Sequence, residues 1–203
     1  LSTAAQQYGG FTVPEVDKIL SPYAQKSYNK YYEEFLKYYD PSWEGREERA
    51  RIYAWEKVCR DCDQGWQGIE YKLNTVGSSR GDYPFVTVTL GLGTGRFEKM
   101  ISKSLLKVHM GGQGKAGHKK PVLFPKIVFL YDEEIHGDGK ECEDVFEAGV
   151  ACSAKTMYPD WLSMSGQGYI SSMYKKYKKV ISPMGCRAFL SPWYERGGME
   201  PAD

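Results

Sequence analysis

Two long stretches in the first third of the chain place their apolar side chains at helical spacing. The first follows Val13-Pro14 and carries apolar residues at i, i+3, i+4 and i+7 (Val16, Ile19, Leu20 and Tyr23). The pattern continues through a tyrosine-rich run to Tyr39, although Pro22 is expected to kink or divide the helix. A second, stronger helix is predicted over residues 46–73. Its apolar stripe consists of Trp55, Val58, Cys59, Cys62, Trp66, Ile69 and Leu73.

The middle of the chain alternates strand and helix patterns. Residues 85–90 have the β-branched content of a strand and run into Gly91-Leu92-Gly93-Thr94-Gly95, after which helical spacing returns. A basic, glycine-rich loop over residues 110–120 precedes a buried-type strand over residues 122–130. Pro125 interrupts this strand, so it is an edge, a bulge or a strand that begins at Lys126. A helix is predicted over residues 141–156 and irregular chain after Tyr158-Pro159-Asp160. This alternation predicts an α/β fold.

Composition narrows the class of protein. The 203 residues are 41% hydrophobic, enough to bury a core. With 27 basic and 26 acidic side chains the net charge is +1, which argues against a general nucleic-acid or membrane-surface binder. No window approaches eighteen consecutive apolar residues, so no membrane span is expected. Five cysteines, an odd number at low density, favour a reducing, cytoplasmic location over a disulfide scaffold.

Most candidate motifs have an ordinary structural interpretation. The Gly91, Gly93 and Gly95 turn lies where glycines can cradle a phosphate, but the third glycine of a dinucleotide fingerprint is replaced by Arg96. A tight strand-to-helix turn is therefore favoured over a phosphate site. Cys59 and Cys62 lie on the apolar stripe without the second cysteine pair that a closed zinc site needs.

The histidines and a lysine cluster have similarly plain interpretations. His109, His118 and His136 do not stand at metal-ligand spacing, and the segment containing Glu133, Glu134 and His136 is expected to be a solvated turn. A late basic cluster (Lys175, Lys176, Lys178 and Lys179) indicates a solvated helix face, with a polyanion contact as the alternative.

Cys186 differs from the other cysteines. It stands between Gly185 and Arg187 in what the preceding Ser182-Pro183 predicts to be the tip of a loop. Glycine permits a sharp turn and close approach of another group, and arginine favours a thiolate or an anionic ligand. Cys186 is therefore a candidate reactive cysteine, and a buried thiol in an ordinary turn is the alternative.

Six short motifs occur in an order that identifies a family. They are Ala5-Gln6-Gln7-Tyr8-Gly9-Gly10, Tyr71-Lys72-Leu73-Asn74-Thr75, Gly91-Leu92-Gly93, Leu123-Phe124-Pro125-Lys126, Met157-Tyr158-Pro159-Asp160 and Met184-Gly185-Cys186-Arg187. Over essentially its whole length the chain resembles the anaerobic, class III ribonucleoside-triphosphate reductases, which are glycyl-radical enzymes. The resemblance implies a ten-stranded α/β barrel in which a cysteine loop meets a glycine loop. It also implies that Cys186 becomes a thiyl radical and removes the 3′ hydrogen of a ribonucleotide, which starts loss of the 2′ hydroxyl.

The departures from the family pattern are equally specific. The chain lacks the Arg-Val-x-Gly-Tyr type segment that holds the radical glycine, the four-cysteine zinc site near it, and the upstream cysteine that works with formate as reductant. A serine that many members carry two places after the loop cysteine is Ala188 here. None of the remaining cysteines matches a family motif, so only packing roles are expected for Cys59, Cys62, Cys142 and Cys152. Residues 1–203 are accordingly expected to be a single partial barrel domain, an internal piece without the N-terminal regulatory region and the C-terminal glycyl-radical and zinc region.

The resemblance also implies cofactors and partners for the whole enzyme. These are a glycyl radical and zinc outside this chain, ribonucleoside triphosphate substrates, nucleotide effectors, a second copy in a homodimer, and an activase that uses S-adenosylmethionine and an iron–sulfur cluster. Two alternatives stay open. One is a non-catalytic nucleotide-binding or assembly module that uses the Gly91 to Gly95 turn and the basic loop. The other is a glycyl-radical enzyme of the formate lyase or dehydratase type.

Overall fold

Four parallel strands form the centre of the molecule. The computed structural model describes residues 10–75, 83–184 and 188–189. In this part of the chain, β1 (Phe11–Val13), β2 (Val86–Leu90), β3 (Lys126–Tyr131) and β4 (Asp160–Ser163) pair in sequential order. A short antiparallel pair, β5 (Pro183–Met184) with β6 (Ala188–Phe189), follows. The predicted α/β class is confirmed, whereas the described residues supply only part of the strands that a ten-stranded barrel needs.

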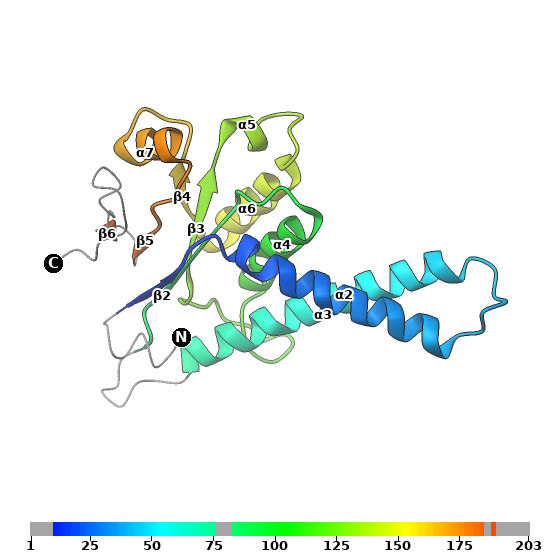
Figure 1. The fold of residues 1–203 in the computed structure, drawn as a ribbon. Coiled ribbons are helices and arrows are strands. Elements are labelled where there is room, and N and C mark those ends of the chain that lie inside the picture. The colour runs from blue at the N-terminus through cyan, green and yellow to red at the C-terminus, as the bar shows by residue number, and fades with distance from the viewer. Residues whose placement is uncertain (1–9, 76–82, 185–187, 190–203) are drawn as a thin grey trace.

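The helices that join the strands gather on one side of the sheet (Figure 1). α2 (Val16–Tyr38) and α3 (Arg46–Thr75) join β1 to β2, and α4 (Arg96–Gly111) joins β2 to β3. α5 (Glu133–His136) and α6 (Glu143–Thr156) join β3 to β4, and α7 (Tyr169–Tyr177) lies on the other side of the sheet. None of the helices among the described residues is long and apolar enough to cross a bilayer.

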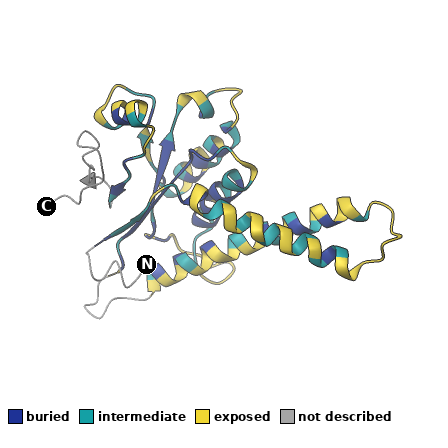
Figure 2. Cartoon of the chain, viewed as in Figure 1, coloured by how far each residue is buried: buried dark blue, intermediate teal, exposed yellow. Residues whose placement is uncertain are grey.

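The central strands are buried, as the dark blue ribbons of Figure 2 show. Successive side chains along these strands point to opposite faces of the sheet and form two buried layers. Leu90 and Phe129 pack into the main core with Val58 of α3 and Leu105 of α4. Neighbouring residues face the other way, where Val128, Leu130 and Met164 form a second cluster under α7 and the chain that follows it. β2 and β3 are buried on both faces, as parallel strands usually are.

α2 and α3 form a long antiparallel hairpin that extends beyond the sheet (Figure 1). Pro22 lies inside α2 without dividing it, so the expected division at Pro22 is wrong. Near the tip, Phe35 stacks on Tyr39 with ring centroids 4.1 Å apart and packs against Tyr53. The tyrosine-rich run therefore packs partly within the hairpin, while Tyr38 remains 72% exposed.

Two expectations about the second half of the chain have clear outcomes. β3 begins at Lys126, directly after Pro125, which confirms one of the three alternatives given for this strand, a start at Lys126. The expectation of irregular chain after residue 160 is wrong, because β4 and α7 form there. β4 has only four residues and alternates between half-buried and exposed positions at one edge of the sheet, so its apolar pattern is weak.

Candidate functional site

The parallel strands all end at the same edge of the sheet, and polar groups gather there. β2 ends at Leu90, immediately before the glycine turn, and β3 ends at Tyr131, just before α5. α2 begins beside them, after β1. Ligands of open α/β sheets bind at this edge, which makes it the first place where a site is expected.

The glycine turn already holds a carboxylate of this chain. The backbone N–H groups of Gly91 and Gly93 donate to Asp17 Oδ2 at 3.0 and 3.1 Å, and Gly95 N–H donates to Glu98 Oε2 at 2.8 Å. These N–H groups are the donors that a phosphate cradle would need. The predicted tight strand-to-helix turn is therefore confirmed, and the alternative of a phosphate site at Gly91, Gly93 and Gly95 is wrong.

Asp17 ties three elements together from a fully buried position at the start of α2. Ser102 of α4 also donates a hydrogen bond to Asp17 Oδ2, at 3.3 Å. Burial raises the pKa of Asp17, and the N–H donors of Gly91, Lys18 and Gly93 partly counter it. An acid in the first turn of a helix is common, so the sequence alone did not mark Asp17. The glycine N–H groups at 91 and 93, which need an acceptor, were the available signal.

His136 is part of the same edge and is buried, so the expectation of a solvated turn is wrong for His136, whereas Glu133 and Glu134 are exposed as expected. Its Nδ1 accepts from Asp132 N–H at 3.0 Å, and its Nε2 donates to the carbonyl of Gly91 at 2.8 Å. Burial lowers the pKa of His136 against these hydrogen bonds, which favours the neutral ring that the bonding pattern requires. Asp17 and His136 thus hold the glycine turn from both sides, which is a structural role.

Cys186 lies outside the described residues, but the chain on both sides of it is described. β5 and β6 flank residues 185–187 and pair antiparallel, with Met184 opposite Ala188. The segment that leads into β5 is fixed to the sheet: Thr12 Oγ1 donates to the carbonyl of Pro183 at 3.0 Å, and the hydroxyls of Thr89 and Ser182 lie 3.2 Å apart. Thr12 and Thr89 alternate with core-facing Val13 and Val88, so these contacts are on the face opposite α2, α3, α4 and α6.

The other four cysteines are free thiols with packing positions. Cys142 and Cys152 are fully buried in the main core, and Cys59 and Cys62 pack against it. Burial raises the pKa of all four thiols, which disfavours reactive thiolates. Among the described residues no three histidine, cysteine or acidic side chains group as metal ligands.

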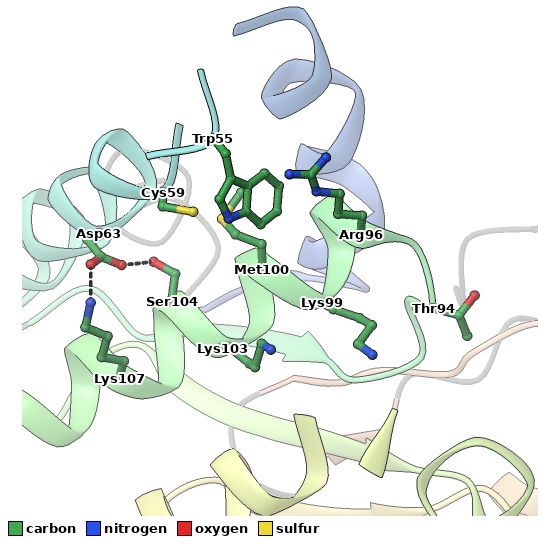
Figure 3. Close-up of a pocket in the computed structure, with 10 residues that line it drawn as sticks. All are labelled: Trp55, Cys59, Asp63, Thr94, Arg96, Lys99, Met100, Lys103, Ser104 and Lys107. Carbon is green, nitrogen blue, oxygen red and sulfur yellow. Dashed lines mark hydrogen bonds and ion pairs between the residues drawn. The ribbon is translucent and has the colours of Figure 1, made fainter. Parts of the chain in front are cut away.

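A cleft with a volume of about 560 Å³ lies between α3 and α4 (Figure 3). Four cations from one face of α4 line it (Arg96, Lys99, Lys103 and Lys107). Three of them are already paired. Asp144 contacts Lys99 and Lys103 at 2.8 and 2.6 Å, and Asp63 contacts Lys107 at 2.6 Å.

The fourth cation, Arg96, is held by aromatic rings. Its guanidinium carbon is 3.7 Å from the centroid of the Trp55 ring and 5.5 Å from that of Tyr28. Arg96 thus packs α4 against α2 and α3, which explains an arginine directly after the glycine turn. Asp144 and Asp63 thus engage all three lysines, although the four cations still exceed the two carboxylates by two charges.

A buried hydrogen-bonded pair of polar side chains that the sequence did not reveal lies at the other end of α4. His109 Nδ1 is 2.8 Å from Glu70 Oε1, with side-chain exposures of 1% and 0%. Gln113 Nε2 also donates to Glu70 Oε2, at 3.1 Å. A glutamate in register with the apolar stripe of α3 was the only sequence signal for this pair.

Comparisons with known proteins agree with this description. The family described as "Anaerobic ribonucleoside-triphosphate reductase" matches residues 1–201. Proteins of that name from Enterobacteria phage T4, Haemophilus influenzae and Escherichia coli are 38%, 35% and 32% identical to the chain, over 98%, 96% and 98% of it. The chain spans only 31%, 26% and 26% of these relatives. The match along almost the whole chain establishes that it belongs to the anaerobic ribonucleoside-triphosphate reductase family.

Proposed function

We propose that this chain is one part of the catalytic barrel of an enzyme that reduces ribonucleoside triphosphates to deoxyribonucleoside triphosphates. The observation that carries the proposal is the family match together with the Met184-Gly185-Cys186-Arg187 segment. Its relatives bear the name of this activity.

In this proposal Cys186 would perform the first step on the substrate. Its S–H would transfer a hydrogen atom to the glycyl radical, the resulting thiyl radical would take the 3′ hydrogen atom of the ribose, and the protonated 2′ hydroxyl would then leave as water. A radical on a glycine outside this chain supplies the one-electron oxidation. Such chemistry needs a site from which water and quenching groups are excluded.

The strand topology supports a barrel. Strands in the order β1, β2, β3, β4 with their connecting helices on one face are the arrangement of an α/β barrel, whereas doubly wound sheets reverse direction and carry helices on both faces. In a barrel the face that carries Thr12 and Thr89 is the interior. The segment that leads to Cys186 is bonded to that face, where the proposed reaction takes place.

The remaining parts of the reductase belong to the proposal as well. We place the radical glycine, the zinc site and the regulatory region outside these 203 residues, and we expect formate as reductant and a separate iron–sulfur activase. We also expect a homodimer, nucleotide effectors and a cytoplasmic location, where free thiols persist. The exposed tyrosines of the α2–α3 hairpin provide a candidate contact surface for the second copy.

The alternative of a non-catalytic nucleotide-binding module depended on the glycine turn and the basic loop. The glycine turn no longer favours it, because Asp17 and Glu98 accept the hydrogen bonds of its N–H groups. A glycyl-radical enzyme of the lyase or dehydratase type does not agree with the family match.

The test is a pair of cysteine variants of the activated full-length enzyme, assayed without oxygen. Cys186→Ser should abolish formation of deoxyribonucleotides while nucleotide binding persists. Cys59→Ser, a matched change at a packing thiol, should retain most of the turnover. Turnover by Cys186→Ser comparable to that of the Cys59 variant would exclude the proposed role.

A further inference from the structure

A second basic cleft lies near the amino-terminal ends of the strands, at the opposite end of the sheet from the glycine turn. α4 runs back from the carboxyl end of β2 and ends at Gly111, and α6 ends at Thr156. Between these helix ends is a cleft of about 390 Å³. It is lined by Lys119 and Lys120 of the α4–β3 loop, by Lys155 of α6, and by His109.

The lysines of this cleft have no ion-pair partner among the described residues, in contrast to the paired Lys99, Lys103 and Lys107 of the cleft between α3 and α4. No carboxylate lines it. Among the described residues, the ammonium groups of Lys119, Lys120 and Lys155 make no ion pair or hydrogen bond. The two helix C-termini contribute about half a negative charge each, which offsets part of the charge of the three ammonium groups.

The loop that carries two of these lysines is held in a fixed shape. Gln113 N–H donates to the Lys120 carbonyl at 2.9 Å, and Lys120 N–H donates back at 2.8 Å. Gly112 has φ +66°, and a Cβ there would stand 2.5 Å from the Lys120 carbonyl oxygen, so the two backbones approach this closely only with glycine. The Gln113 side chain anchors the loop to Glu70 of α3. Both lysines are thereby placed beside the cleft before any ligand arrives.

His109 adds a directional group to the wall of the cleft. Its Nδ1 is hydrogen-bonded to Oε1 of the buried Glu70 at 2.8 Å. This hydrogen bond fixes the orientation of the imidazole ring beside the cleft.

We propose that this cleft binds a triphosphate group, either inorganic triphosphate or the phosphate tail of a nucleoside triphosphate. Three unpaired ammonium groups and an oriented imidazole match a compact, multiply charged oxyanion. The volume lies within the range of small-molecule sites. The proposal does not depend on Cys186, since it concerns the amino-terminal edge of the sheet and not the reaction.

Lysine acetylation followed by mass spectrometry tests this site locally in the full-length protein. Sodium tripolyphosphate should slow acetylation of Lys119, Lys120 and Lys155 at least fivefold and leave the exposed Lys26 and Lys30 of α2 unchanged. ATP should protect the same three lysines, and adenosine should not. Protection by ATP alone would show that the nucleoside is also recognised. Absence of protection by both anions, or equal protection at Lys26 and Lys30, overturns the proposal.

A charge-matched pair of variants gives the second test. Lys119→Ala/Lys120→Ala should weaken tripolyphosphate binding about tenfold or more, because two charge-assisted contacts are lost. Lys26→Ala/Lys30→Ala removes the same charge at the protein surface and should change the affinity less than twofold. Equal weakening by both pairs would attribute binding to the overall charge and reject the site. Circular dichroism checks that both variants are folded.

Discussion

Alanine at position 93 should destabilise the chain through contact with Asp17. A Cβ on Gly93 would stand 2.5 Å from Glu98 Cβ and 2.9 Å from Asp17 Oδ2. Such separations are too short for real Cβ contacts, so the turn or the two side chains must shift. Asp17 is fully buried and bonded to three elements, and it has no free space into which to move.

The size of the effect follows from two terms. Overpacking a well-packed interior costs about 1–3 kcal/mol. Displacing Asp17 leaves the Gly93 N–H without its buried acceptor, which costs about 1–3 kcal/mol more. Gly93→Ala should therefore lower the free energy of unfolding by about 2–6 kcal/mol.

Urea unfolding followed by tryptophan fluorescence measures this change, since Trp66 is only 3% exposed in the folded chain. Gly68→Ala is the matched control. Gly68 lies within α3, and a Cβ there meets no atom within 4 Å, so the same substitution should stabilise the helix by about 0.5–1 kcal/mol. A value for Gly93→Ala within about 0.5 kcal/mol of wild type would refute the close packing of the turn around Asp17.

Three further predictions concern ionisable groups. Burial raises the pKa of Asp17, so the contribution of Asp17 to the free energy of unfolding should fall as the pH rises from the ordinary aspartate pKa to the raised pKa of the folded chain. Asp17→Asn should remove this pH dependence in parallel urea titrations. Because burial lowers the pKa of His136, stability should be lost as pH falls below the ordinary value of 6.5, and His136→Gln should flatten this loss in the same experiment. Cys142 and Cys152, which are fully buried, should resist iodoacetamide in the folded chain while the partly exposed Cys59 reacts, and peptide mass spectrometry of labelled samples measures the difference; equal labelling would contradict their burial.

Long periodic segments were predictable because a single buried face dictates their pattern. The stripe over residues 46–73 identified α3 (Arg46–Thr75) almost to its ends, and the β-branched run identified β2. β4 and α7 were missed because each is short. Their apolar residues pack against residues that are distant in the chain, such as Leu130, so the local sequence pattern does not reveal them.

The polar framework of the candidate site was less predictable, because it depends on pairings between distant residues. Asp17 accepts from Gly91, 74 positions away, and His136 donates to the same residue from the other side. Side chains of these types are usually exposed, so sequence pattern favours solvent for both. Their burial becomes favourable only when the folded sheet supplies the N–H and carbonyl partners.

The face of the sheet opposite α2, α3, α4 and α6 links this framework to the proposed reaction. A parallel sheet needs cover on both faces, and the described chain covers this face with α7, Ile135 of α5 and the segment that leads into β5. Thr89 is fully buried there, and its hydroxyl accepts from Glu15 N–H at 2.8 Å and meets Ser182. Thus one strand residue fixes both the entry to α2 and the approach to the cysteine segment. The proposed radical transfer over a short distance requires fixed placement of the reacting group, and these hydrogen bonds hold the segment that precedes Cys186 against the central strands.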